Sequence, residues 1–410
     1  MWVTTKPNTV DSLQFTADSE VTSDCSLSTV DCKLSVVKKL RIGVIYGGRS
    51  GEHEVSLASA AAVFQNLDPE RYETIAIRIE KDGRWSLPRR PPAQMKAADV
   101  IQSKPELSEQ ARETHLVANP GTDTLLTIDR RDDHVVVSGL GLDVVFPVLH
   151  GPYGEDGTVQ GLLELANVPY VGAGVLASAV GMDKAVMKLV FAAKGLPICD
   201  YEVVLKRDWQ QNERALMNQL AAKLGFPVFV KPANLGSSVG ISKAKHATEL
   251  RDAVNLAAEF DRKIVVEAAV AKAREIECAV LGNDDPEASL PGEIIPSREF
   301  YDYEAKYLDE SSRTIVPAQL TKKQTEEVRR LAIAAFKALD CAGMARVDFL
   351  LAGNGILYLN EVNTIPGFTT ISMYSKMWDA SGVPYPKLLD RLIELAIDRH
   401  AEKQQLRTSM

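Results

Sequence analysis

Blocks of apolar and polar residues follow one another along most of the chain, with the lengths of strands and helices in an α/β protein. An apolar run at 41–46 predicts a buried strand, which ends at two glycines, and a helical pattern follows at 55–66. Apolar runs at 73–79 and 143–149 predict further strands. Strand, glycine turn, helix and strand in this order predict the start of a parallel α/β domain.

The second half of the chain has shorter apolar runs, which predict many short strands between helices. Asp183 has the position of an N-cap before an amphipathic helix, and Thr321 with Gln324 has the spacing of a capping box before another. Many short strands favour an α+β arrangement over one doubly wound sheet. We expect the other elements as strands at 201–205, 228–231, 240–243, 263–267, 275–281 and 292–295, and as helices at 213–224 and 247–260.

These patterns divide the chain into three predicted modules with an extension at each end. Residues 1–39 are rich in Ser and Thr without an apolar period, which is typical of a flexible extension. Between 85 and 137 the pattern is weak, and the polar, proline-containing part at 88–121 predicts loops with a short helix. The predicted modules are an N-terminal domain at 40–172, subdomains at 173–266 and 267–399, and a tail at 400–410.

Composition narrows the classes of protein to consider. The 410 residues are 45% hydrophobic and 25% charged, as in an ordinary globular protein. Lys and Arg number 47 against 55 Asp and Glu, and the net charge of −8 disfavours a nucleic-acid partner. The five scattered cysteines form no C-x-x-C motif and the N-terminus has no signal-peptide pattern, so we expect a cytoplasmic protein. No apolar stretch is long enough to predict a membrane span.

The segment 346–363 carries the clearest chemical signal. Two apolar runs flank an Asn-Gly pair at 354–355, which predicts a hairpin with a two-residue type I′ turn. Side chains alternate between the two faces of a strand, so positions that are opposite each other share a face. The predicted turn therefore brings four polar residues onto one face, as the opposed pairs Asp348 with Glu361 and Arg346 with Asn363.

Two opposed carboxylates on this face destabilise each other unless a cation lies between them. Oxygens of Asp, Glu and Asn are the ligands that Mg²⁺ prefers. Leu350 and Leu359 are expected on the same face, which indicates partial burial and favours a metal site. The alternative is a solvated polar face of an edge hairpin.

Two lysines and a glycine-rich loop suggest that this half of the chain also binds phosphates. Lys231 ends an apolar strand, and the Gly/Ser-rich segment 234–240 lies between it and the next strand. Such a loop can fold over phosphates, although it is not a P-loop and a plain flexible hairpin fits it as well. Lys184, in the first turn of a helix, indicates by itself only a solvated charge. Together with the carboxylate hairpin, these features predict a nucleoside triphosphate bound with Mg²⁺.

Polar residues also follow two predicted strands of the first domain. The glycine turn at 47–51 lacks the dinucleotide fingerprint, but the helix start after it could hold Glu52 or Glu54 against an ammonium group. The alternative is that both glutamates only favour the helix start. His150 follows a buried strand, where α/β sheets bind ligands, and an ordinary turn residue is an equal alternative.

Taken in order, these segments resemble the D-alanine–D-alanine ligases of the ATP-grasp superfamily. The resemblance runs from about residue 39 to about residue 396 and leaves out the N-terminal extension. It rests on the motifs Gly47-Gly-x-Ser-x-Glu-x-Glu-Val-Ser56, His150-Gly-x-x-Gly-Glu-Asp-Gly157, Met182-Asp-Lys184, Lys231-Pro-x-x-x-Gly-Ser-Ser-Val-Gly240, Tyr301-Asp-Tyr-Glu-Ala-Lys-Tyr307, Arg346-x-Asp348 and Asn360-Glu-Val-Asn-Thr-x-Pro-Gly367.

The resemblance implies an α/β fold in which a Rossmann-like N-terminal domain precedes two α+β ATP-grasp subdomains. It implies ATP-dependent ligation of two D-alanine molecules through an acyl phosphate, for peptidoglycan precursor synthesis. ATP is then a co-substrate, two Mg²⁺ ions are cofactors that Mn²⁺ can replace, and the protein is a homodimer. Neither a nucleic acid nor a membrane is an expected partner.

The resemblance also implies roles for individual residues. The ATP-binding set is Lys184, Lys231 and Lys306 at the phosphates, the segment from Glu267 to Val270 at adenine, Glu275 at ribose, and Ser237 in the loop over the phosphates. The metal ligands are Asp348, Glu361 and Asn363. Arg346 and the Gly367 N–H are the implied oxyanion stabilisers. Glu52 and His150 lie at the first substrate, and Ser372 binds the carboxylate of the second. Ser237 and Tyr307 are lid residues linked to Glu52.

Alternatives of two classes stay open. A ligase of this kind could take D-lactate or D-serine as its second substrate, but Tyr307 favours the dipeptide, since the resemblance associates depsipeptide formation with a changed lid or Phe there. A non-catalytic nucleotide-binding regulator could share the fold, although the complete set at 346, 348, 361 and 363 argues against it. A nicotinamide dehydrogenase is disfavoured by the missing fingerprint near Gly47. No general base for the attacking amine is identified.

Overall fold

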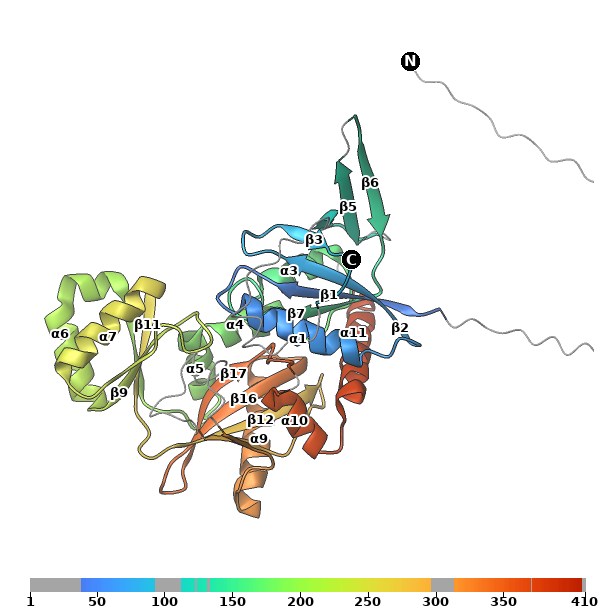
Figure 1. Ribbon diagram of the computed structural model, residues 1–410. Helices are drawn as coiled ribbons and strands as arrows, with labels where there is room; N and C mark the ends of the chain where they lie inside the picture. Colours follow the sequence, from blue (N-terminus) through green and yellow to red (C-terminus); the bar gives the residue numbers. More distant parts are fainter. Residues whose placement is uncertain are drawn as a thin grey trace, which may run out of the picture. The chain divides into compact units, whose positions relative to one another are not determined.

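Three sheets, each packed against helices, organise the part of the chain that the computed structural model describes (Figure 1). The described residues are 38–92, 112–121, 124–130, 133–295, 313–369 and 371–407. Residues 39–410 form one unit by their internal contacts. Nearly all of the predicted extension at 1–39 lies outside the described ranges, as do Lys306 and Tyr307.

The first sheet begins as the sequence predicts. Strands β1 (Leu40–Gly47), β2 (Tyr72–Ile79) and β7 (Val144–Val148) are parallel, with β1 in the middle. Helix α1 (His53–Asn66) covers one face of β1 and α3 (Thr158–Ala166) the other. The sequence of a strand that is covered on both faces is a continuous run of apolar residues, and these strands could be predicted for that reason.

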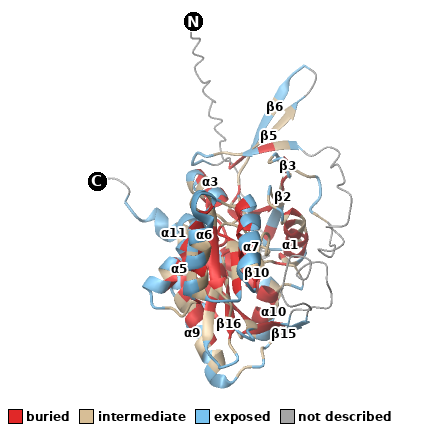
Figure 2. Cartoon of the chain, turned by 90° about the vertical axis from the view of Figure 1, so that its left-hand side faces the viewer, coloured by how far each residue is buried: buried red, intermediate tan, exposed pale blue. Residues whose placement is uncertain are grey.

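The same sheet continues into an antiparallel meander that the sequence pattern did not reveal. Strands β3 (Trp85–Leu87), β4 (Arg112–Leu116), β5 (Leu125–Arg130) and β6 (Val135–Leu140) extend it in the order β6-β5-β4-β3-β2-β1-β7. The prediction of loops with a short helix at 88–121 is therefore wrong at β4. Thr114 is the only buried residue of β4, and β6 is mostly exposed (Figure 2), so these strands have too few apolar positions to be recognised.

The second sheet is antiparallel, with the order β10-β9-β11-β8. Its strands are β8 (Tyr201–Leu205), β9 (Val228–Pro232), β10 (Ser242–Ala244) and β11 (Lys263–Ala268). Helices α6 (Lys206–Leu224) and α7 (Ala247–Phe260) cover one face and bury Val230 and Val266 (Figure 1). Because side chains alternate along a strand, Lys231 and Glu267 point to the other face.

The third sheet has the order β15-β14-β12-β16-β17, with β13 on β12. Its strands are β12 (Arg274–Gly282), β13 (Glu287–Ala288), β14 (Gly292–Ile295), β15 (Arg313–Ile315), β16 (Gly343–Leu351) and β17 (Leu357–Asn363). Helix α9 (Lys322–Ala338) packs on it and begins at the capping box of Thr321 and Gln324, as predicted. Helices α4 (Val175–Met182) and α5 (Lys184–Ala193) pack on the same core, and Asp183 caps α5 as predicted.

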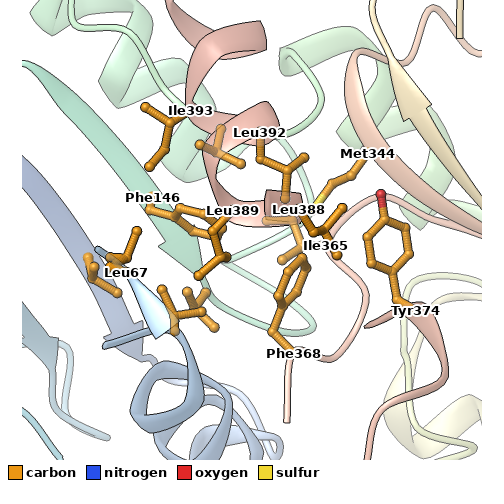
Figure 3. Close-up of a cluster of buried hydrophobic side chains, with 14 of the residues drawn as sticks. Leu67, Phe146, Met344, Ile365, Phe368, Tyr374, Leu388, Leu389, Leu392 and Ile393 are labelled. Atoms are coloured by element: carbon orange, nitrogen blue, oxygen red, sulfur yellow. The ribbon is translucent and has the colours of Figure 1, made fainter. Parts of the chain in front are cut away.

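The C-terminal helices connect the first and third sheets. Helices α10 (Met373–Ala380) and α11 (Tyr385–Gln404) share one apolar cluster with β1 and β7. Figure 3 shows Phe146 of β7 in this cluster with Leu389 of α11 and with Ile365 and Phe368, which follow β17. The loop after β17 is thus packed against the N-terminal sheet. No helix in the described part of the chain is long and apolar enough to cross a membrane.

The hairpin of β16 and β17 pairs as predicted where the polar residues lie, but its turn differs. Arg346 is opposite Asn363 and Asp348 is opposite Glu361. The Ala352 N–H donates to the Ile356 carbonyl at 2.8 Å, so three residues, 353–355, form the turn. The predicted two-residue turn is wrong.

A β-bulge restores the predicted register on the side away from the turn. Phe349 is opposite Leu359 while Asp348 is opposite Glu361, so Asn360 is the extra residue on β17. The bulge turns Leu359 into the buried core together with Phe349. Leu359 therefore does not share a face with Asp348 and Glu361, and that part of the prediction is wrong.

Gly47 ends β1 in a conformation that other residues rarely adopt. Its φ is +92°, and a Cβ there would lie 2.2 Å from the carbonyl oxygen of Ile79. Gly47→Ala is expected to lower the free energy of unfolding by about 2–5 kcal/mol, from left-handed strain and overpacking together. Urea unfolding measures the loss. Gly51→Ala is the control, because nothing lies within 4 Å of a Cβ at Gly51, and equal losses in the two variants would contradict the prediction.

Candidate active site

The polar face of the β16–β17 hairpin is organised around Asp348. Arg346 binds this carboxylate with two hydrogen bonds, from Nε to Oδ1 at 2.8 Å and from Nη2 to Oδ2 at 2.7 Å. The Asn363 side-chain amide also donates to Asp348 Oδ2, at 2.9 Å. The structure thus brings three of the four predicted residues into direct contact, with Glu361 opposite Asp348.

Glu277 on β12 is a further member of this group that the sequence pattern did not reveal. It is buried, lies opposite Asp348 in the strand register, and its Oε2 is 3.3 Å from Arg346 Nε. Burial opposes the charge of Arg346, but Asp348 and Glu277 outweigh it, and the pKa of Arg346 lies well above its ordinary value. The guanidinium is therefore a permanent positive charge between carboxylates of neighbouring strands.

The donor atoms on this face supply only part of the coordination shell of a divalent cation. Asp348, Glu361 and Asn363 offer carboxylate and amide oxygens, the hard ligands that Mg²⁺ prefers. Among the described residues, no group of three His, Cys, Asp or Glu side chains converges to hold a metal. Mg²⁺ needs six oxygens and commonly shares them with phosphates. The residues therefore fit a Mg²⁺ ion whose coordination a phosphate-bearing ligand completes.

Lys184 and Lys231 both reach this hairpin from other elements. Lys184 Nζ donates to the Leu235 carbonyl at 2.6 Å and lies 3.9 Å from Glu361 Oε2. Lys231 Nζ donates to Asn360 Oδ1, on the bulge, at 3.3 Å. Lys184 is buried, so the alternative of a solvated charge is wrong, and this burial lowers its pKa. Two ammonium groups beside paired carboxylates are an arrangement that can receive an anion together with a cation.

A third lysine, Lys188, lies under this pair and was not predicted. Glu267 sits between Lys188 and Lys231, with N–O distances of 3.1 Å and 2.7 Å. Lys188 is 1% exposed and Glu267 3%. Burial opposes the ionised form of Glu267, but the two ammonium groups outweigh it and lower its pKa to about 2. The spacing of four residues from Lys184, one helical turn, was the available signal for Lys188.

The Gly/Ser-rich segment 234–240 lies against the start of α1. The Ser237 hydroxyl donates to Glu52, and a Cβ on Gly236 would be 3.0 Å from Glu52 Oε2. Glu52 occupies the N-cap position of α1 without a capping hydrogen bond from its side chain, whereas Glu54 pairs with Lys81. Glu52 therefore faces the loop, and a role limited to the helix start does not account for it.

Glu155, in the predicted motif at 150–157, is a second carboxylate at this place. Its Oε1 accepts the Gly151 N–H at 2.9 Å, and the backbone of Ile365 is near enough to act on the carboxylate. Burial and the nearby Glu52 raise the pKa of Glu155 well above its ordinary value. Glu155 thus lies near both Glu52 and the backbone of Ile365, in the loop after β17.

The remaining predicted residues lie on three segments. His150 is buried beside Ile365, and burial lowers its pKa. Gly367 lies in the loop after β17, and the Ser372 hydroxyl accepts the N–H of Thr369 at 2.9 Å. Val270 follows β11, and Glu275 lies on β12 opposite Leu350.

Comparisons with known proteins identify the family of this chain. Residues 41–173 match the family model described as D-ala D-ala ligase N-terminus, and residues 190–394 match that of the D-ala D-ala ligase C-terminus. The D-alanine–D-alanine ligase of Solibacter usitatus is 52% identical over 370 residues, 90% of this chain and 99% of the relative.

Two solved structures are also similar. The D-alanine-D-alanine ligase from Coxiella burnetii has a TM-score of 0.75 and 41% identity, covering 90% of this chain and 96% of that one. The VanG D-Ala:D-Ser ligase from Enterococcus faecalis has a TM-score of 0.76 and 35% identity, covering 88% and 100%. These matches confirm the predicted fold class, a Rossmann-like N-terminal domain followed by ATP-grasp subdomains. The chain belongs to the D-alanine–D-alanine ligase family.

Proposed function

We infer that the protein uses ATP to join two D-alanine molecules to D-alanyl-D-alanine, for peptidoglycan precursor synthesis. The family supports this function, since relatives that share about half of the residues over nearly their whole length carry this name. One structural observation carries it: Lys184 and Lys231, from separate elements, meet the hairpin of Asp348 and Glu361. That juxtaposition suits a nucleotide phosphate bound beside a cation.

The chemistry accounts for the positive charges in the site. A carboxylate does not react with an amine, because oxide would have to leave. Transfer of the γ-phosphoryl group of ATP to the carboxylate of the first D-alanine makes an acyl phosphate and ADP. The amine of the second D-alanine then attacks the carbonyl carbon, phosphate leaves and the amine loses a proton. Negative charge develops in both steps, and Lys184, Lys231 and Arg346 are positioned to stabilise it.

Asp348, Glu361 and Asn363 are the residues that we propose hold Mg²⁺, two ions according to the family resemblance. When bound, Mg²⁺ supplies positive charge to the phosphates of the nucleotide. Arg346 holds Asp348 by both oxygens, which orients that carboxylate before any ligand binds. Mn²⁺ would accept the same oxygen donors.

The substrate pocket is proposed at Glu52, between the start of α1 and the loop 234–240. Glu52 would receive the ammonium group of the first D-alanine, and Ser372 the carboxylate of the second. The Ser237 hydroxyl donates to Glu52, and this contact supports the proposal that the loop 234–240 closes over the pocket. A closed loop excludes water, which would otherwise hydrolyse the acyl phosphate. Lys306 and Tyr307 keep their proposed roles at the phosphates and in the lid, but they lie outside the described residues.

Release of ADP tests the function directly. Purified protein with ATP, Mg²⁺ and D-alanine is expected to release ADP and form the dipeptide, while L-alanine or omission of Mg²⁺ gives neither. Bound ATP without turnover would favour the non-catalytic regulator. Parallel reactions that contain D-lactate or D-serine beside D-alanine test the choice of second substrate, and a mixed product preferred at neutral pH would replace the dipeptide assignment. The homodimer and the cytoplasmic location stay predictions.

A further inference from the structure

Ser59 and His150 form a buried hydrogen-bonded pair that no role in the proposed reaction yet explains. Ser59 lies on α1, two helical turns after Glu52, and His150 follows β7. Their exposed fractions are 0% and 5%, and the Ser59 Oγ to His150 Nε2 distance is 3.2 Å. Both residues contact the loop after β17, so the pair connects the N-terminal domain to the loop that contains Gly367.

The partners of this pair determine where its protons lie. His150 Nδ1 is 3.1 Å from the Ile365 carbonyl oxygen, which can only accept, so Nδ1 carries the proton. Nε2 is then an acceptor, and the Ser59 hydroxyl donates to it. Ser59 Oγ in turn accepts the N–H of Phe368 at 3.2 Å. We call this chain of hydrogen bonds from Ile365 through His150 and Ser59 to Phe368 the relay. Every donor in it has an acceptor when His150 is neutral with its proton on Nδ1.

Both ends of the relay lie close to Gly367 in the chain. Ile365 is two residues before Gly367 and Phe368 is one residue after it. Ile365 and Phe368 are buried, whereas Gly367 is partly exposed. Anchors on both sides of one residue restrict the rotation of its peptide planes, and so fix the direction of the Gly367 N–H.

We propose that Ser59 is a positioning residue for the ligase reaction, which holds His150 in its Nδ1-H tautomer and thereby orients the Gly367 N–H toward the developing oxyanion. The oxyanion role of Gly367 rests on the proposed function. In this arrangement both ring nitrogens of His150 are occupied by the protein, so His150 supports the loop and exchanges no proton with the substrate. Glu52 and Arg346 are the charged groups that act on its ring.

The tautomer can be tested without any activity measurement. Protein with ¹⁵N-labelled histidine gives long-range ¹H–¹⁵N correlations that distinguish the two neutral tautomers and the imidazolium, and a His150→Gln variant assigns the signal. The expected result at pH 7 is neutral His150 with its proton on Nδ1. A proton on Nε2, or an imidazolium, would overturn the proposal even in a fully active enzyme.

Kinetics of Ser59→Ala test the consequence for catalysis. The variant removes the donor to His150 and the acceptor of the Phe368 N–H, and kcat is expected to fall about 10–100-fold, as for other groups that orient a reacting group. KM for ATP should stay unchanged, since the lysine cluster is not touched. Ser178→Ala is the matched control, because this helix serine is also fully buried and its hydroxyl has no hydrogen-bond partner among the described residues.

Each outcome bears on the proposal in a defined way. A kcat loss in Ser59→Ala no larger than that in Ser178→Ala would refute the positioning role. A loss of kcat that leaves the tautomer and ring chemical shifts of His150 as in the wild type would also refute it. The loss would then not act through the relay. Lack of ligase activity in the wild-type protein would instead refute the proposed function, and the tautomer result would stand by itself.

Discussion

Glu361→Gln is expected to slow dipeptide formation about a thousandfold, the order lost when one preorganised electrostatic group is removed from an active site. The substitution keeps the size of the side chain and removes one of the two opposed charges. Glu361 lies opposite Asp348 and 3.9 Å from Lys184, so it faces both the proposed cation site and a phosphate-binding lysine. With Gln there, less negative charge is available to hold Mg²⁺.

The same substitution should leave the folded state intact. Removing one of two opposed carboxylates relieves a repulsion in the metal-free protein but also takes away the carboxylate beside Lys184, so the unfolding midpoint is expected to change little. Steady-state kcat at saturating ATP and D-alanine, measured over a range of Mg²⁺ concentrations, gives the result. Glu326→Gln, at an exposed position on α9, is the control. Wild-type kcat in Glu361→Gln would show that the metal assignment is mistaken.

Lys188→Met is expected to lower the free energy of unfolding by up to about 3–5 kcal/mol, the range for removing one partner of a buried ion pair. Lys188 and Glu267 are almost fully buried and 3.1 Å apart, so water cannot replace the lost ammonium group. Lys231 alone would then compensate Glu267. Urea unfolding measures the loss, and Lys323→Met on the exposed side of α9 controls for the change of residue type.

A double variant separates the ion pair from the packing of each side chain. Glu267→Gln alone leaves Lys188 without a buried counter-charge, and we expect a loss similar to that in Lys188→Met. The double variant removes both charges of the Lys188–Glu267 pair and leaves only Lys231 without its carboxylate, so its loss should be smaller than the sum of the two by about 1–3 kcal/mol. Strict additivity would mean that the two side chains contribute independently.

The hairpin shows how far local pattern can lead and where it fails. Its apolar runs and Asn-Gly pair predicted that Asp348 and Glu361 are opposed, and they are. The turn has three residues where two were expected, and the bulge at Asn360 compensates for the difference. Neither feature has a clear local signal, because a bulge forms where the partner strand and the packing of Leu359 favour it.

Several site residues could not be predicted because their partners are distant in the chain. Glu277 meets Asp348 only through the pairing of β12 with β16, and Lys188 meets Glu267 only because α5 packs near β11. Glu155 was visible in its motif, but its place near Ile365 depends on the packing of the loop after β17 against the first domain.

The sequence by itself determined the elements whose pattern is local: the buried strands, the capped helices, the polar face of the hairpin and the motifs that indicated the family. Periodicity of side chains along a strand or helix is set by backbone geometry, and that is why it can be read from neighbouring residues. Only the tertiary structure decided which charges meet. Lys231 with Glu267, Ser237 with Glu52, and Ser59 with His150 are each brought together by tertiary contacts between segments far apart in the chain. Burial removes water as an alternative partner and leaves these groups to one another.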